Sequence, residues 1–160
     1  MSIQLRTLTP QDTVAAASIF FAAVHEGTAD VYSHEQRRAW AGDQPAPQVW
    51  QHRFDTMDGV AATKGNAMVG FMTIDAEGDI DLAFVHPDYM GTGIGRVVYH
   101  AIEDRARALG VRQLTTYASE KAKPFFGRMG WSVEATNTVF KSAVALQNYR
   151  MFKVLPCRPA

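Results

Sequence analysis

The chain contains little of what several classes of protein require. Cys157 is the only cysteine among 160 residues, so one chain cannot form the disulfide framework of a small secreted domain. Sixteen lysines and arginines balance sixteen aspartates and glutamates, so the basic excess of a nucleic-acid or membrane-surface protein is missing. No apolar run reaches the roughly 18 residues of a membrane span, and the start MSIQLRTLTP lacks the pattern of a signal peptide. These absences predict a cytoplasmic globular protein with no nucleic-acid or membrane partner.

Length and composition predict one domain over residues 1–160. A chain of this length can bury a sizeable core. Its composition, 47% hydrophobic and 20% charged, is that of a globular protein rather than a disordered one. No internal repeat or low-complexity linker divides the sequence. The five histidines are scattered without the spacing of metal ligands, so no metal site is expected.

Residues before position 60 predict one strand followed by helices. Residues 2–8 alternate apolar and polar side chains, as a strand does. Thr9 is a suitable N-cap, Pro10 suits the first helical position, and Gly27 can end the helix. Two further helical segments are expected at 33–42, where a capping-box pattern begins the helix, and at 45–57.

The remainder predicts a sheet interrupted by two helices. The turn signals Gly65-Asn66 and Glu77-Gly78-Asp79 divide residues 59–85 into three antiparallel strands. Later elements are a long helix at 94–109, a strand at 111–118, a short helix at 120–130 and closing strands at 131–140 and 145–155. Strand 111–118 follows a strand–helix unit, so it should lie parallel to the strand before the helix. The expected fold is α+β: a mostly antiparallel sheet of six to seven strands, flanked by helices.

A glycine-rich turn precedes the long helix. Gly91, Gly93 and Gly95 alternate, and Arg96 follows them. No lysine follows Gly95 as a P-loop requires, and the spacing does not fit the dinucleotide fingerprint. A glycine-rich turn that begins a helix still presents backbone N–H groups and the positive end of the helix dipole. Without Cβ atoms, phosphate oxygens can approach the backbone closely. The turn therefore predicts binding of a phosphate-bearing ligand.

Two segments of the sequence resemble one family. VHPDYMGTGIGRVVYHAI, residues 85–102, is similar to the acetyl-CoA motif of the GCN5-related N-acetyltransferases, the GNAT family. ASEKAKPFFGRMGW, residues 118–131, resembles the later segment of that family. With the order of elements, the resemblance covers nearly the whole chain. It implies a GNAT-like sheet with one splayed parallel pair of strands, and acetyl-CoA as cosubstrate. It further implies direct transfer of the acetyl group to a primary amine of a small molecule or peptide.

The resemblance also implies how acetyl-CoA would be held. The thioester arm would lie between the splayed strands and bind backbone groups of Phe84 and Val85. An N–H group aimed at the thioester carbonyl would stabilise the oxyanion of the tetrahedral intermediate. Ser119 occupies the position of a family asparagine and would also contact the cofactor. The diphosphate would bind the residues of the turn, which are Gly91, Thr92, Gly93, Ile94, Gly95 and Arg96.

Two departures from the family pattern bear on catalysis. Met90 replaces a glutamine or arginine that is often near the diphosphate. Phe126 replaces the tyrosine that often protonates the leaving thiolate, and phenylalanine cannot donate a proton. Tyr117, at the end of the parallel strand, is a candidate replacement acid. Cys157 lies in a proline-rich terminus and is not expected to act as a nucleophile.

The strand before the turn offers two candidate bases. A period of two places Asp79 and Asp81 on one face, about 7 Å apart, and Ile80, Leu82 and Phe84 on the other. Neighbouring carboxylates in a closed site repel each other, which favours proton uptake by one of them. Asp81 is the first candidate, because it is nearer the expected thioester, and Asp79 is the second. The alternative is that both are solvated carboxylates beside a turn.

Alternatives remain open at the level of function. Without the family tyrosine, the chain could be a non-catalytic acyl-CoA-binding module, and the glycine turn alone would also suit a nucleotide-dependent oxidoreductase. The acceptor pocket is expected between the N-terminal helices and the closing hairpin, near Tyr32 and Trp40. That hairpin has an exposed edge through which two copies could pair, so a homodimer is left open beside the monomer.

Overall fold

The computed structural model describes residues 2–156, so Cys157 lies outside the described residues. Seven strands form one sheet in the order β1-β2-β3-β4-β5-β7-β6. The strands are β1 (Ile3–Thr7), β2 (Asp58–Lys64), β3 (Ala67–Ile74), β4 (Asp79–Val85), β5 (Gln113–Ser119), β6 (Ser132–Lys141) and β7 (Val144–Val154). The α-helices are α1 (Thr13–His25), α2 (His34–Ala41), α3 (Ile94–Ala108) and α4 (Lys123–Arg128). Short 3-10 turns are η1 (Pro10–Asp12), η2 (Pro47–Trp50), η3 (Arg53–Asp55) and η4 (Pro87–Tyr89).

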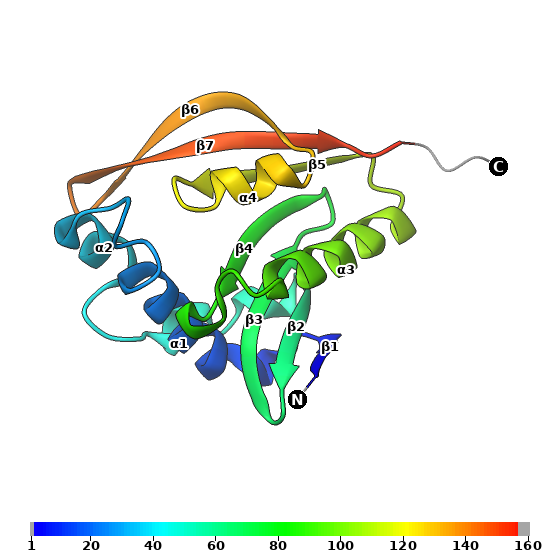
Figure 1. Ribbon diagram of the computed structural model, residues 1–160, viewed down its shortest axis with the longest axis horizontal. Helices are drawn as coiled ribbons and strands as arrows, with labels where there is room; N and C mark the ends of the chain where they lie inside the picture. The colour runs from blue at the N-terminus through cyan, green and yellow to red at the C-terminus, as the bar shows by residue number, and fades with distance from the viewer. Residues whose placement is uncertain (1, 157–160) are drawn as a thin grey trace.

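The sheet has the predicted α+β topology. β4 and β5 are its one parallel pair among the described strands, and all other neighbouring strands are antiparallel. Figure 1 shows α3 and the α1–α2 pair on opposite sides of the sheet, with the β6–β7 hairpin reaching toward α2. The Gln36 side chain of α2 donates to the Ala145 carbonyl of the hairpin at 3.0 Å. None of the described helices is long and apolar enough to cross a membrane.

The two faces of the sheet carry separate apolar cores. The α3-side core joins helix residues such as Val98 and Ile102 to sheet residues such as Ile80 and Leu114. The α1-side core joins Ala16 and Ile19 to residues that include Trp50, Phe54, Phe71 and Leu82. Both cores are well buried, so they fix β4 from two sides.

A polar network closes the α3-side core. Glu103 accepts hydrogen bonds from Tyr99, from Arg107 at 2.7 Å and from Lys153 at 3.0 Å. The Trp131 indole donates to the Tyr99 hydroxyl at 2.9 Å. Burial alone would raise the pKa of Glu103, but these three donors outweigh burial and lower it to about 2. The network therefore ties α3 to β7 and to the segment after α4.

The structure corrects the expected third helix. Residues 45–57 contain η2 and η3 instead of an α-helix. Pro47 occupies the first turn of η2, and its missing N–H group and fixed φ angle suit the start of a helical turn but not its interior. Trp50 and Phe54 nevertheless lie in the α1-side core.

A bulge corrects the predicted faces of β4. Met72 pairs with Ala83 and Ile74 pairs with Ile80, so β4 holds one extra residue between these pairs. An extra residue reverses the alternation of side chains beyond it. Consequently Ile80 lies in the α3-side core, whereas Leu82 and Phe84 contact the α1-side core. The sequence pattern had placed all three on one face.

Candidate active site

The parallel strands β4 and β5 diverge soon after they meet. Their register contains only Asp79 opposite Thr115 and Ile80 opposite Thr116. β5 remains paired with β7 from Gln113 to Ser119, and β4 remains paired with β3 up to Val85. The edge of β4 that faces β5 is therefore open beyond Ile80. An open strand edge presents backbone donors and acceptors to an extended ligand.

The glycine turn lies where β4 leads into α3. Gly91 and Gly93 have φ angles of 76° and 91°, a left-handed conformation that costs an L-residue roughly 1–2 kcal/mol. A Cβ added to either would meet nothing within 4 Å, so backbone conformation rather than crowding explains these two glycines. Gly95 instead faces Phe125 and Val85.

The N–H groups at the start of α3 are available to a ligand. Thr92 donates its backbone N–H to Tyr89 at 3.3 Å, but in the described chain the N–H groups of residues 93–96 donate to no backbone carbonyl. The Ile94 side chain is buried in the α3-side core, so only its backbone can serve a ligand. The Arg96 side chain is exposed beside the turn. Four N–H groups and the helix dipole together suit an anion.

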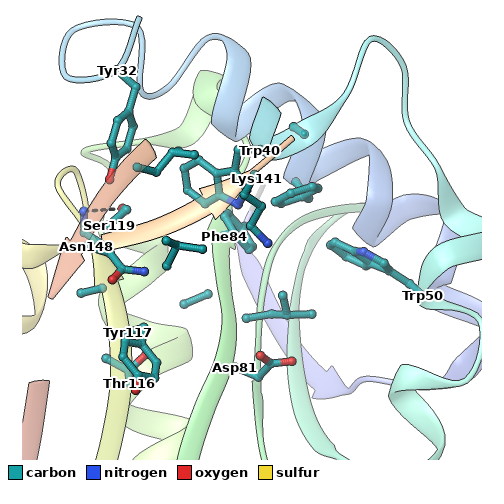
Figure 2. A pocket seen from close by; sticks show the side chains of 18 of the residues that line it. Tyr32, Trp40, Trp50, Asp81, Phe84, Thr116, Tyr117, Ser119, Lys141 and Asn148 are labelled. Atoms are coloured by element: carbon teal, nitrogen blue, oxygen red, sulfur yellow. Dashed lines mark hydrogen bonds between the residues drawn. The ribbon is translucent and has the colours of Figure 1, made fainter. Parts of the chain in front are cut away.

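A cleft of about 680 Å³ occupies the gap between β4 and β5. Its floor includes Asp81–Phe84 of β4 and Thr116–Ser119 of β5. Figure 2 shows Trp40 beside Phe84, with Asp81 and Tyr117 toward the other end of the cavity in this view. Residues of η2, α4 and the β6–β7 hairpin complete the lining. The expected acceptor pocket thus meets the open edge of β4.

Asp81 lies in this cleft beside a cation. Its carboxylate pairs with the Arg53 guanidinium at 2.8 Å, and its side chain is 30% exposed. Arg53 also lies 6.0 Å from the Trp50 ring. The ion pair orients Asp81, so its charged neighbour is the Arg53 guanidinium and not the second carboxylate that the sequence suggested. No local pattern in the sequence indicates Arg53, because the contact joins residues 28 positions apart that tertiary packing brings together.

The structure separates Asp79 from Asp81. Asp79 accepts hydrogen bonds from Thr115 at 2.8 Å and from Arg150 at 3.2 Å. It lies where β4 and β5 still pair, outside the lining of the cleft. Tyr117 lines the cleft and is 55% exposed, with the Arg150 guanidinium 4.6 Å from its ring. The geometry therefore brings Asp81 and Tyr117, but not Asp79, to one cavity.

The surroundings of Phe126, Tyr32 and Tyr149 limit which side chain near the cleft can donate a proton. Phe126 lines the cleft but is 2% exposed and has no polar atom. Tyr32 donates to the Gln147 carbonyl at 2.7 Å and accepts from the Glu120 N–H group at 2.9 Å, so its hydroxyl is already paired. Burial raises the pKa of Tyr32, and the 2.5 Å hydrogen bond to Glu120 raises the pKa of Tyr149. Both tyrosines therefore hold their protons more tightly than usual.

Two further positions bear on a ligand in the gap. The Ser119 hydroxyl oxygen accepts the Ala122 N–H at 3.1 Å, which leaves the hydroxyl hydrogen able to donate to a neighbour in the cleft. The Met90 side chain packs against Gly27, where an added Cβ would lie 2.3 Å from the Met90 methyl group. Met90 therefore joins the turn to the segment after α1, a packing role instead of a phosphate contact.

Comparisons with known proteins agree on one family. Residues 28–153 match the family described as the acetyltransferase (GNAT) domain. The chain is 31% identical over 130 residues to YafP of Escherichia coli (strain K12), an uncharacterised N-acetyltransferase, and the match covers 81% of each protein. The crystal structure of a GCN5-related N-acetyltransferase from Rhodopseudomonas palustris is 35% identical, with a TM-score of 0.90 over 97% of each chain. A phosphinothricin acetyltransferase from Sinorhizobium meliloti, solved with acetyl-CoA, is 20% identical. Its TM-score is 0.74, over 97% of this chain and 89% of that one.

Proposed function

Because the chain belongs to the GCN5-related N-acetyltransferases and is therefore an acetyl-CoA-dependent acetyltransferase, we propose that it acetylates a primary amine of a small molecule or peptide. The acetyl group passes directly from the thioester to the amine. The cleft that joins the open edge of β4 to the aromatic wall of the α1–α2 side supports this proposal. Cleft volume and shape suit a compact acceptor, and the related phosphinothricin acetyltransferase takes such an acceptor by its name.

The divergence of β4 from β5 is the observation that carries the proposal. Separation of two paired strands forfeits ladder hydrogen bonds and leaves backbone donors and acceptors that an extended ligand between the strands can satisfy. Backbone groups of Phe84 and Val85 would bind the pantetheine arm along the open edge. The N–H groups of residues 93–96, with Arg96, would hold the diphosphate. Ser119 would donate to the arm from the β5 side.

Asp81 is the proposed base for the acceptor amine. An amine must be neutral to attack a thioester, so its proton has to leave at or before the attack. Asp81 lines the same cleft as the open edge of β4, and Arg53 fixes its orientation. Tyr117 is the proposed proton donor to the leaving thiolate, because its hydroxyl is not committed to another side chain or backbone group in the described chain. Asp79 remains the second candidate base, although it does not line the cleft.

One observation favours a second candidate function. The family tyrosine is replaced by the buried Phe126, so a chain that binds acyl-CoA without transferring the acyl group would show the same cleft. A thiolate is nevertheless a good leaving group, and proximity of amine and thioester supplies much of the rate on its own. Amine-dependent turnover of acetyl-CoA distinguishes the two functions.

The test measures thiol release from acetyl-CoA across a panel of primary amines, alongside thermal shifts with acetyl-CoA, CoA, NADH and ATP. The proposal expects acetyl-CoA and CoA alone to raise the melting temperature, and an amine-dependent release of free thiol. A stabilisation by NADH or ATP without one by CoA contradicts it. Stabilisation by CoA, with no acetylated product from any amine by mass spectrometry, favours the binding module.

A further inference from the structure

The cleft contains one cation that the protein leaves without a counter-charge. The charged residues that line it are Arg53, Asp81 and Lys141. Arg53 and Asp81 neutralise each other across 2.8 Å. Lys141 is an exposed residue of the lining and makes no side-chain hydrogen bond or ion pair with any other residue in 2–156. The lining therefore has a net charge of about +1 that a bound molecule can balance.

The fold directs Lys141 into the cleft. Strand alternation puts Asn137, Val139 and Lys141 of β6 on the side that lines the cavity. Figure 2 shows the Lys141 amino group extending toward the space beside Phe84. A tight turn at Ser142 and Ala143 follows, with φ angles of 49° and 63°. Because these residues are not glycine, the turn keeps a conformation that is disfavoured for them.

The wall between Lys141 and Asp81 is apolar. Phe20, Trp40 and Phe84 contact one another with ring centroids 5.0 to 6.2 Å apart. Trp50 extends this wall at 5.0 Å from Phe20. An aromatic wall beside a carboxylate base and a lysine fits a ligand that carries an amine, an acid group and apolar carbon.

We infer that the acceptor is an amino acid with an apolar side chain or skeleton, and that Lys141 recognises its carboxylate. This inference rests on the proposed function. The amine of the acceptor lies toward Asp81, and its apolar carbons lie against the aromatic wall. Lys141 then acts as a specificity-determining residue that distinguishes an acidic acceptor from a neutral amine of the same shape.

Matched acceptors test the role of the carboxylate. One pair is L-phenylalanine and L-phenylalaninamide. The other pair is ε-aminocaproate and ε-aminocaproamide, in which a longer chain separates the amine from the acid or amide group. We expect kcat/KM to favour the carboxylate in at least one pair by about two- to fivefold, the worth of one partly exposed ion pair. The lower basicity of an α-amino amide leaves more neutral amine, so it works against the expected preference in the first pair.

Variants then assign the preference to Lys141. Lys141→Met should abolish it, mostly through KM, and Lys141→Arg should restore much of it. Arg112→Met is the matched control, because Arg112 is exposed before β5 and does not line the cleft. Binding of the N-acetyl products in the presence of CoA provides the same comparison without turnover.

Several results would overturn the inference while leaving the proposed function intact. These are equal use of both members of each pair, a carboxylate preference that survives in Lys141→Met, or a loss in Arg112→Met as large as in Lys141→Met. Binding of neither pair of products, in an enzyme that binds acetyl-CoA and acetylates other amines, also overturns it. Failure to bind acetyl-CoA at all would instead contradict the proposed function.

Discussion

Glu103 and Asp81 are carboxylates on opposite sides of one sheet, and their surroundings differ in the number of donors. Glu103 receives hydrogen bonds from Tyr99, Arg107 and Lys153, and it is 8% exposed. Asp81 has one cationic partner, Arg53, and its side chain is 30% exposed. A carboxylate with three protein donors has little capacity left for another proton. A carboxylate with one partner, at the surface of a cavity, remains accessible to a substrate. We therefore expect Glu103 to contribute to stability, and we propose that Asp81 contributes to catalysis.

The largest effect on activity is expected on the cleft side of the sheet, where Asp81 lies. Asp81→Asn should lower kcat/KM about 100- to 1,000-fold, since a positioned base contributes a factor of this order. The loss should be greatest at low pH, where removal of the amine proton limits the rate. Stability should change by about 1 kcal/mol or less, because the Arg53 pair is partly exposed. Asp79→Asn, which also removes a carboxylate beside an arginine, is the matched comparison. A larger loss in that variant would transfer the role of base to Asp79.

The α3 side of the sheet should show the opposite response, with a large loss of stability and little loss of activity. Glu103→Gln should lower the free energy of unfolding by about 2 to 3 kcal/mol, because charged Arg107 and Lys153 lose their buried partner. Urea unfolding measures this, and for a domain of this size the melting temperature should fall by about 4 to 12 °C. kcat/KM of the folded variant should stay within about threefold of the wild type. A stable Glu103→Gln protein with poor activity would contradict the division between the two sides.

The pH dependence of stability sharpens the comparison. The folded pKa of Glu103 is lowered from 4.5 to about 2, so its contribution is fully present above pH 4.5 and is lost as the pH falls toward 2. A shift of this size corresponds to about 3 kcal/mol. We expect the stability gap between wild type and Glu103→Gln to close between about pH 5 and pH 2. A gap that is constant with pH would show that the Glu103 charge is not what stabilises the network.

A smaller effect is expected at the glycine turn. Gly93→Ala forces an L-residue into a φ angle of 91°, so the turn should distort and acetyl-CoA should bind about tenfold more weakly. Gly127→Ala is the control, because Gly127 lies in α4 and an added Cβ there meets nothing within 4 Å. That change should raise stability slightly, through helix propensity. Isothermal titration of acetyl-CoA measures both variants, and equal affinities would remove the turn from cofactor binding.

Local signals accounted for most of the fold. The turns at Gly65-Asn66 and Gly78, and the glycine that follows α3 at Gly110, fall where the sequence places them. The parallel β4–β5 pair follows from the strand–helix–strand pattern. These features depend on neighbouring residues, so a single sequence contains them.

Features that depend on distant residues were not predicted. The bulge in β4 comes from its pairing with β3, and it moves Ile80 away from the face of Leu82 and Phe84. The pairing of Arg53 with Asp81 depends on how η3 packs against the sheet. Prolines and short turns replaced the expected helix at 45–57. The candidate cofactor turn could therefore be derived from sequence, whereas the surroundings of the candidate base could not.

A crystal structure of the protein soaked with acetyl-CoA tests the central claim most directly. The account predicts diphosphate oxygens within hydrogen-bond distance of the N–H groups of residues 93–96, and the thioester arm between β4 and β5 alongside Phe84 and Val85. Density for the coenzyme elsewhere, with the gap between the two strands holding only water, would contradict it.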